Sequence, residues 1–145
     1  MNQGSRAVRV AAVVPLTLAA LSLLVAGCSN RNAPQTDTPR TGNVTVTPGP
    51  GGVQAITIHG DDDLRFHPST FHVRPGTVKI TLHDSGATPH ELAFTGKLRN
   101  QISITMQGQS NSMEFTVRVP GRYPFICGLH ERENMTGTMI VDPAR

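Results

Sequence analysis

The sequence contains no tryptophan and one tyrosine, and aromatic residues make up only 4% of its 145 residues. A folded core therefore has to be built mainly from aliphatic side chains. Cysteine is also scarce, because Cys28 and Cys127 are the only two and lie far apart in the chain. A disulfide between them is the structural alternative, but we do not expect one, since the two cysteines are predicted to have unrelated roles.

Charged residues are sparse as well, at 16% of the chain, and the formal net charge is +3. Arg6 and Arg9 supply two of these positive charges and lie in a segment that we expect to be removed. A nucleic-acid-binding protein needs a clustered basic face, and this sequence has none. We therefore expect no nucleic-acid partner. The length predicts one folded domain.

The sequence has a single long apolar run, from Val10 to Ala26. It follows Arg6 and Arg9 and ends in small residues before Cys28, so residues 1–27 have the layout of a secretory signal peptide. Its length is near the lower limit of a bilayer-spanning helix, ~17–25 residues, which leaves a permanent membrane anchor as the alternative. The VAGC sequence that ends at Cys28 favours the signal peptide, because it resembles the lipobox of bacterial lipoproteins.

The lipobox resemblance implies that Cys28 carries acyl chains and becomes the first residue of the mature protein. Two or more such chains hold a protein stably at a membrane surface. Residues 28–52 are rich in Pro, Gly, Thr and Asn, and such a composition predicts a flexible tether. A short edge strand around Thr45 and Val46 is compatible with it. We expect a bacterial protein that is lipid-anchored in the cell envelope, outside the cytoplasm.

From residue 53 to residue 145 apolar and polar residues alternate, which is typical of half-buried β-strands. Turn-forming pairs, such as Pro75-Gly76 and Pro120-Gly121, lie between the alternating stretches. Short strands at regular spacing, without a convincing helical pattern, indicate an all-β domain, a Greek-key β-sandwich of about eight strands. The clearest apolar faces contain Ile56 and Ile58, Phe71 and Val73, Val78 to Leu82, and Phe115 to Val119.

A thiol, an imidazole and a thioether lie together in the short segment between the last two predicted strands, at Cys127, His130 and Met135. Soft thiolate and thioether ligands favour copper, and imidazole suits it as well. Two histidines and a cysteine in a plane, with a weak axial methionine, form the blue-copper electron-transfer site. One further histidine must then come from elsewhere in the chain.

The spacing Cys-x-x-His-x-x-x-x-Met before a final strand resembles the copper loop of plastocyanin-like cupredoxins. The Pro-His pair that ends at His90 resembles the first ligand of the same family, and the resemblance covers the whole predicted sandwich. It implies a cupredoxin-like fold that binds one copper ion, alternating between Cu(I) and Cu(II), through His90, Cys127, His130 and Met135. It also implies that His130 is the exposed ligand at which electrons enter and leave.

The alternation of the strands provides a check that is independent of this motif. His90 is in phase with the apolar Leu92 and Phe94, and Cys127 is in phase with Phe125. Since alternate side chains share one face of a strand, both donors should point into the same end of the sandwich. Backbone N–H groups are expected near the Cys127 sulfur.

Each donor taken alone has a structural alternative. His90 could be a hydrogen-bonded histidine at a strand end, Cys127 a buried structural thiol, and Met135 a core-filling side chain. Their combination with His130 favours copper. The other histidines are not expected to bind metal: His59, His72 and His83 should face solvent on their strands, and His67 should lie in a loop. The acidic run Asp61–Asp63 lacks EF-hand spacing and is expected to form a solvated turn.

Two features depart from the plastocyanin pattern. Glu91 follows the first histidine ligand, where plastocyanins usually have an asparagine whose side chain ties the ligand loops together. Residues 131–133, Glu-Arg-Glu, follow His130 directly. The partner surface is therefore predicted to be charged, with Leu129 as the large apolar residue beside the exposed ligand.

Three functions remain open at this point. The first is single-electron transfer between redox partners outside the cytoplasm, by a membrane-tethered monomer. The second is copper sequestration, delivery or resistance with the same ligands. The third is a metal-free binding module, which the complete ligand set disfavours. An enzyme is not expected, because the chain offers one closed four-ligand site and no second copper cluster.

Overall fold

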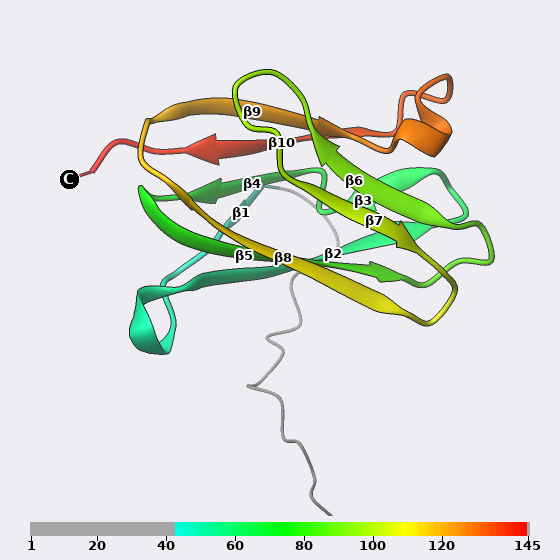
Figure 1. Cartoon of the computed structure of the whole chain (residues 1–145), viewed down its shortest axis with the longest axis horizontal. Helices are drawn as coiled ribbons and strands as arrows, with labels where there is room; N and C mark the ends of the chain where they lie inside the picture. The colour runs from blue at the N-terminus through cyan, green and yellow to red at the C-terminus, as the bar shows by residue number, and fades with distance from the viewer. Residues whose placement is uncertain (1–42, 145) are drawn as a thin grey trace, which may run out of the picture. The chain divides into compact units, whose positions relative to one another are not determined.

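The structure, a computed structural model, describes residues 43–144 and consists of β-strands arranged in two sheets (Figure 1). The described chain has ten strands and two short 3-10 helices, η1 (Pro50–Gly52) and η2 (Gly128–His130). The all-β prediction is confirmed, with ten strands rather than about eight. No helix in this part of the chain is long and apolar enough to cross a membrane. The predicted signal peptide, the lipid on Cys28 and residues 28–42 of the tether lie outside the described residues.

The larger sheet has six strands in the order β1, β4, β10, β9, β6, β7, and the smaller has four in the order β3, β2, β5, β8. In chain order the strands are β1 (Asn43–Thr45), β2 (Gln54–Asp61), β3 (Arg65–His67), β4 (Thr70–Val73), β5 (Gly76–Asp84), β6 (His90–Phe94), β7 (Gln101–Thr105), β8 (Ser110–Val117), β9 (Gly121–Ile126) and β10 (Thr136–Val141). Strand β4 is parallel to β1 and β10, and β2 is parallel to β5, whereas the other pairs are antiparallel. The chain crosses repeatedly between the sheets, as in the predicted sandwich.

The core between the sheets is mostly aliphatic, as the scarcity of aromatic residues predicts, but its centre is aromatic. The ring of Phe125 is fully buried and lies 5.1 Å from that of Phe66, 5.6 Å from that of Phe94 and 6.1 Å from that of Phe71, between centroids. Phe115 packs against Phe94 at 5.6 Å. All five phenylalanines of the chain therefore form one connected cluster, and such edge-to-face pairs add to the energy of burial.

The folded domain begins earlier than the predicted boundary at Val53. Strand β1 pairs with β4 at the edge of the six-stranded sheet, and Val46 is 8% exposed. The backbone N–H of Val46 donates a hydrogen bond to the carbonyl of His72, at 2.8 Å. Residues 43–52 thus belong to the folded domain rather than to the tether, and the short edge strand predicted around Thr45 and Val46 is β1, Asn43–Thr45.

The strand ends next to the predicted ligands His90 and Cys127 lie at one end of the sandwich. Strand β6 starts at His90 and runs antiparallel to β9, which ends at Ile126. The last residue of β9, Ile126, pairs with Ala93, so the chain that follows β9 from Cys127 lies beside the start of β6. Figure 1 shows η2, in orange, at this end, between the end of β9 and the start of β10.

Replacing Gly137 should destabilise the fold, because β10 passes close to the ring of Phe125 at this glycine. A Cβ at Gly137 would overlap that ring and lie 2.7 Å from the Ser69 carbonyl oxygen. Overpacking a core costs ~1–3 kcal/mol, so Gly137→Ala should lower the free energy of unfolding by about that amount in urea denaturation.

Gly49→Ala is the control for this variant. Its Cβ would meet only the Val53 carbonyl oxygen, at 3.6 Å, which is an ordinary contact. It should change the free energy of unfolding by less than ~0.5 kcal/mol. Equal stabilities of the two variants would contradict the packing described for Gly137.

Candidate metal centre

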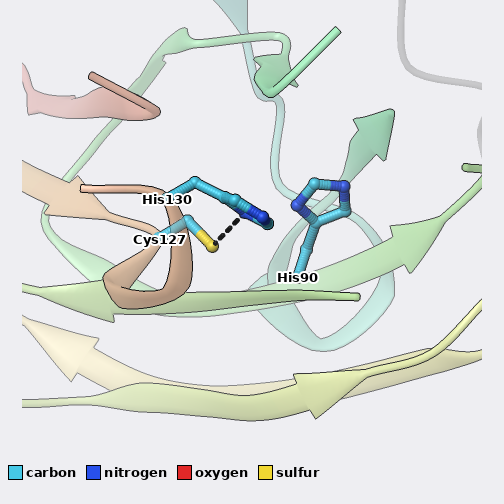
Figure 2. Close-up of side chains that lie close together, drawn as sticks. All are labelled: His90, Cys127 and His130. Carbon is cyan, nitrogen blue, oxygen red and sulfur yellow. Dashed lines mark hydrogen bonds between the residues drawn. The ribbon is translucent and has the colours of Figure 1, made fainter. Parts of the chain in front are cut away.

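Three of the four predicted donors meet at the end of the sandwich where β6 starts and β9 ends. The donor atoms of His90, Cys127 and His130 all lie within 4.8 Å of one another, and no other such group of three is found among residues 43–144. Figure 2 shows His90 facing the two donors of the loop that follows β9. The rings of His90 and His130 are 5.1 Å apart between centroids, and Cys127 Sγ lies 3.4 Å from His130 Nδ1.

His90 is placed by the alternation of β6, as predicted. It is fully buried, like Leu92 on the same face of the strand. Its ring packs on Gly60 of β2 in the facing sheet, where a Cβ would come within 2.6 Å of His90 Cδ2. Gly60 is therefore needed to make room for the imidazole.

The buried ring nitrogens of His90 have no hydrogen-bond partner of normal geometry, although the Asp61 backbone carbonyl acts weakly on the ring. Burial lowers the pKa of His90, and the Asp84 carboxylate partly opposes this shift. The imidazole is thus neutral near pH 7, which is the form that binds metals. Since a buried polar group is normally paired, a ring lacking a proper partner fits a metal ligand.

Cys127 is fully buried at the point where β9 leads into η2. The backbone N–H of Glu91 points to its sulfur at 3.5 Å, as expected for a supporting N–H group. Burial raises the pKa of the Cys127 thiol, and this N–H only partly offsets the shift. The metal-free thiol is therefore protonated at neutral pH, and a metal ion has to displace that proton when it binds.

The loop from Cys127 to Met135 is closed by its own backbone. The N–H of Cys127 donates to the carbonyl of Met135 at 3.0 Å, and the N–H of Met135 donates to the carbonyl of His130 at 3.2 Å. Asn134 takes a positive φ of 57° at the turn before Met135. Met135 is fully buried at the end of this loop, and its role as the fourth ligand stays a prediction.

Glu91, the departure from the plastocyanin pattern, connects the strand of the first histidine to the ligand loop. Its Oε1 accepts a hydrogen bond from the backbone N–H of Gly128 at 3.0 Å. A Cβ at Gly128 would overlap that carboxylate. The carboxylate thus forms the link between the two segments, and it places a negative charge beside Cys127.

The acidic run Asp61–Asp63 was expected to be a solvated turn, but it also supports the site. Oδ1 of Asp62 accepts hydrogen bonds from the backbone N–H groups of Ala87 at 2.8 Å and Thr88 at 2.9 Å. Hydrogen bonds from Thr88 lower the pKa of Asp62. Asp62 therefore holds in place the loop that leads into His90.

Asp84 is a second acidic residue that sequence reasoning missed. It is fully buried, its Oδ1 accepts a hydrogen bond from the N–H of Gly86 at 3.0 Å, and it acts electrostatically on His90. Its position could have been found, because it continues the inward phase of Ile80 and Leu82 on β5. A buried carboxylate beside a ligating histidine is a common supporting arrangement in metal sites.

A mononuclear metal site with two imidazoles and one thiolate, at the end of an all-β sandwich, defines the class of this protein. The chain belongs to the cupredoxin family, since residues 17–141 match the family model described as a cupredoxin-like domain. Copper is the cofactor that fits both the family and the donor set, because thiolate and imidazole suit it.

The curated relatives include two chloroplast plastocyanins of Arabidopsis thaliana. The minor isoform is 30% identical over 94 residues, which are 57% of this chain and 54% of the relative. The major isoform is 26% identical over 105 residues, which are 63% of this chain and 62% of the relative. The chain thus spans less than two thirds of the length of these relatives.

Solved structures with the same fold include auracyanins. The dithionite-reduced auracyanin of Roseiflexus castenholzii is 25% identical, with a TM-score of 0.52, over 61% of this chain and 97% of that structure. Auracyanin A of Chloroflexus aurantiacus, described as a blue copper protein, is 19% identical, with a TM-score of 0.55, over 63% of this chain and all of that structure. The second likeness concerns the fold alone.

Removing the charge of Glu91 should raise the reduction potential of the copper-loaded protein. A nearby negative charge stabilises the more positive oxidised site, so its loss favours reduction. About 1 kcal/mol for a partly exposed pair corresponds to roughly 40 mV for one electron. Glu91→Gln keeps an acceptor for the Gly128 N–H and should show this shift in voltammetry.

Glu133→Gln is the matched control, since it removes the same charge from an exposed position on the ligand loop. It should shift the potential by less than Glu91→Gln does. Equal shifts for the two variants, or none for Glu91→Gln, would show that Glu91 has no special influence on the site.

The metal-free protein should lose stability as the pH falls below about 6.5. The pKa of His90 is lowered in the folded protein. On acidification the unfolded chain therefore binds a proton at this residue before the folded chain does, and this protonation stabilises the unfolded state. The contribution of His90 to the free energy of unfolding is fully present at pH values above the pKa that His90 has in the unfolded chain. It declines as the pH falls from there toward the pKa of the folded state, by up to ~1.4 kcal/mol per pH unit. Urea denaturation between pH 7.5 and 5 measures this slope. His90→Gln should reduce it, and an unchanged slope would refute the assignment to His90.

Proposed function

We propose that this protein is an extracytoplasmic type 1 copper protein that transfers single electrons between redox partners, held at a membrane by a lipid on Cys28. The observation that carries the proposal is that the donor atoms of His90, Cys127 and His130 lie within 4.8 Å of one another, with His90 and Cys127 fully buried. Plastocyanins are among the relatives, and the 25% identical auracyanin is described in a dithionite-reduced form, which marks that protein as able to accept electrons.

Bound copper would supply the one-electron chemistry, and the protein would hold its ligands. His90, Cys127 and His130 would hold the ion, and the buried Met135 is the proposed fourth donor. Mixed nitrogen and sulfur donors suit both Cu(I) and Cu(II). Because His90 and Cys127 extend from paired strands, the scaffold resists displacement of either donor when the charge of the site changes.

His130 is the proposed point of electron entry and exit. It is partly exposed, whereas His90, Cys127 and Met135 are fully buried. Leu129 next to it is 46% exposed, and the charged residues 131–133 are exposed as well. A redox partner would therefore meet one apolar side chain within a charged rim. Charges in such a rim steer association more than they add affinity.

Copper sequestration or delivery would use the same donors and is the alternative function. Three of the four proposed donors are fully buried, so release of the ion requires the loop from 127 to 135 to open. Electron transfer needs no such opening, nor any entry of a substrate as in catalysis. The closed site therefore favours an electron carrier over an ion carrier or an enzyme.

The visible and EPR spectra of the Cu(II)-loaded protein test this proposal. We expect an intense blue band with narrow copper hyperfine splitting, both absent in Cys127→Ser, because the thiolate–copper bond is their source. Stopped-flow mixing of oxidised and reduced protein with small redox reagents should then show fast, reversible one-electron exchange.

A competing chelator separates the two candidate functions. An electron carrier should keep its copper over many oxidation–reduction cycles in the presence of the chelator. Rapid loss of Cu(I) to the chelator, or a colourless Cu(II) complex, would contradict electron transfer and favour copper handling.

A further inference from the structure

Three histidines outside the copper site form a row across the four-stranded sheet. His59 of β2 is the register partner of His67 on β3 and also of His83 on β5. Directly opposed residues of an antiparallel pair, such as His59 and His67, have Cβ atoms only about 4.5–5.5 Å apart. We call His67, His59 and His83 the histidine row.

The row lies on the outer face of this sheet. Each of its histidines is partly buried and stands next to a fully buried residue on its own strand, such as Ile58, Phe66 or Leu82. Since successive side chains alternate between faces, the imidazoles point away from the core. The sequence pattern predicted this orientation for His59 and His83, whereas His67 was expected in a loop and in fact ends β3.

Two imidazoles of the row are close together, and two have a neighbouring oxygen atom on one ring nitrogen. The rings of His59 and His83 are 5.4 Å apart between centroids, at 82° to each other. Nδ1 of His83 lies 2.9 Å from Ser110 Oγ, so Nε2 is the ring nitrogen that would bind a metal ion. Nε2 of His67 lies 2.7 Å from Oδ2 of Asp63. Ligating histidines typically have such an oxygen partner on the second ring nitrogen.

We propose that the histidine row is a second metal site, which binds one divalent late transition metal ion such as Zn²⁺ or Cu²⁺. Neutral imidazole is a good ligand for these ions. His59 and His83 are the two principal ligands, and His67 is the third, with water completing the coordination. The carboxylate of Asp63, 51% exposed beside His67, adds negative charge that favours a cation.

Binding requires the rings of the row to turn toward one another, since their donor atoms do not form a group of three within 4.8 Å. The contacts of His83 with Ser110 and of His67 with Asp63 have to shift with the rings, so metal binding must offset the cost of this rearrangement. On one side the row is flanked by the small side chains of Thr57 and Thr81, and Ser112 faces Thr81.

The proposed site is separate from the copper centre. Gly60, the next residue after His59, faces inward and packs on the ring of His90. The two sites therefore lie on opposite faces of β2, and an ion in the row shares no donor with the copper centre. The proposal does not depend on electron transfer at that centre.

Calorimetric titration of the copper-loaded full chain with Zn²⁺ tests the proposal. Copper occupies the first site, and its visible spectrum, followed during the titration, shows that Zn²⁺ does not displace it. We expect one Zn²⁺ ion to bind per chain. His59→Gln should weaken binding by at least about tenfold, since it removes the central ligand of the row, and His83→Gln should do the same.

His72→Gln is the matched control, because His72 lies on the other sheet and pairs with Asp142 at 3.1 Å. It should leave the Zn²⁺ affinity unchanged. The thermal midpoint and visible spectrum of every variant establish that it is folded. Absence of Zn²⁺ binding to the copper-loaded chain, or binding that neither His59→Gln nor His83→Gln weakens, would overturn the proposal.

Discussion

The pairing of β6 with β9 is the constraint on which the metal centre depends. Their antiparallel register places Phe94 opposite Phe125 in the core, and it brings the residues that follow β9 beside the start of β6. The N–H of Glu91 then reaches the sulfur of Cys127, and the carboxylate of the same residue binds Gly128. Two donors far apart in sequence are thereby fixed by the same ladder that builds the core.

The environment of the donors also fixes their chemical state. Burial keeps His90 neutral and holds the Cys127 thiol in its protonated form until a metal replaces the proton. Desolvation works against charge in both groups, so the metal-free site is uncharged at these two positions. A cation that binds both donors removes the cost of their burial, which couples copper binding to the stability of the sandwich.

The fold class and the meeting of three donors could be predicted because both follow from local patterns. Alternation fixes which face His90 and Cys127 share, and the loop spacing places His130 beside them. Alternation gives the inward position of Asp84, but the supporting roles of Asp62 and Asp84 could not be assigned in the same way, because these roles depend on which loops and strands meet across the sandwich. The early start of the domain was missed for the same reason, since β1 is a strand only through its pairing with β4.

Crystal structures of the metal-free and copper-loaded protein would test the central claim, that the scaffold holds the donors together before copper binds. The account predicts that His90, Cys127 and His130 keep their positions, with their donor atoms still within 4.8 Å of one another in the metal-free crystal. A metal-free crystal structure in which the loop from 127 to 135 swings away from β6, or in which His90 turns out of the core, would contradict it.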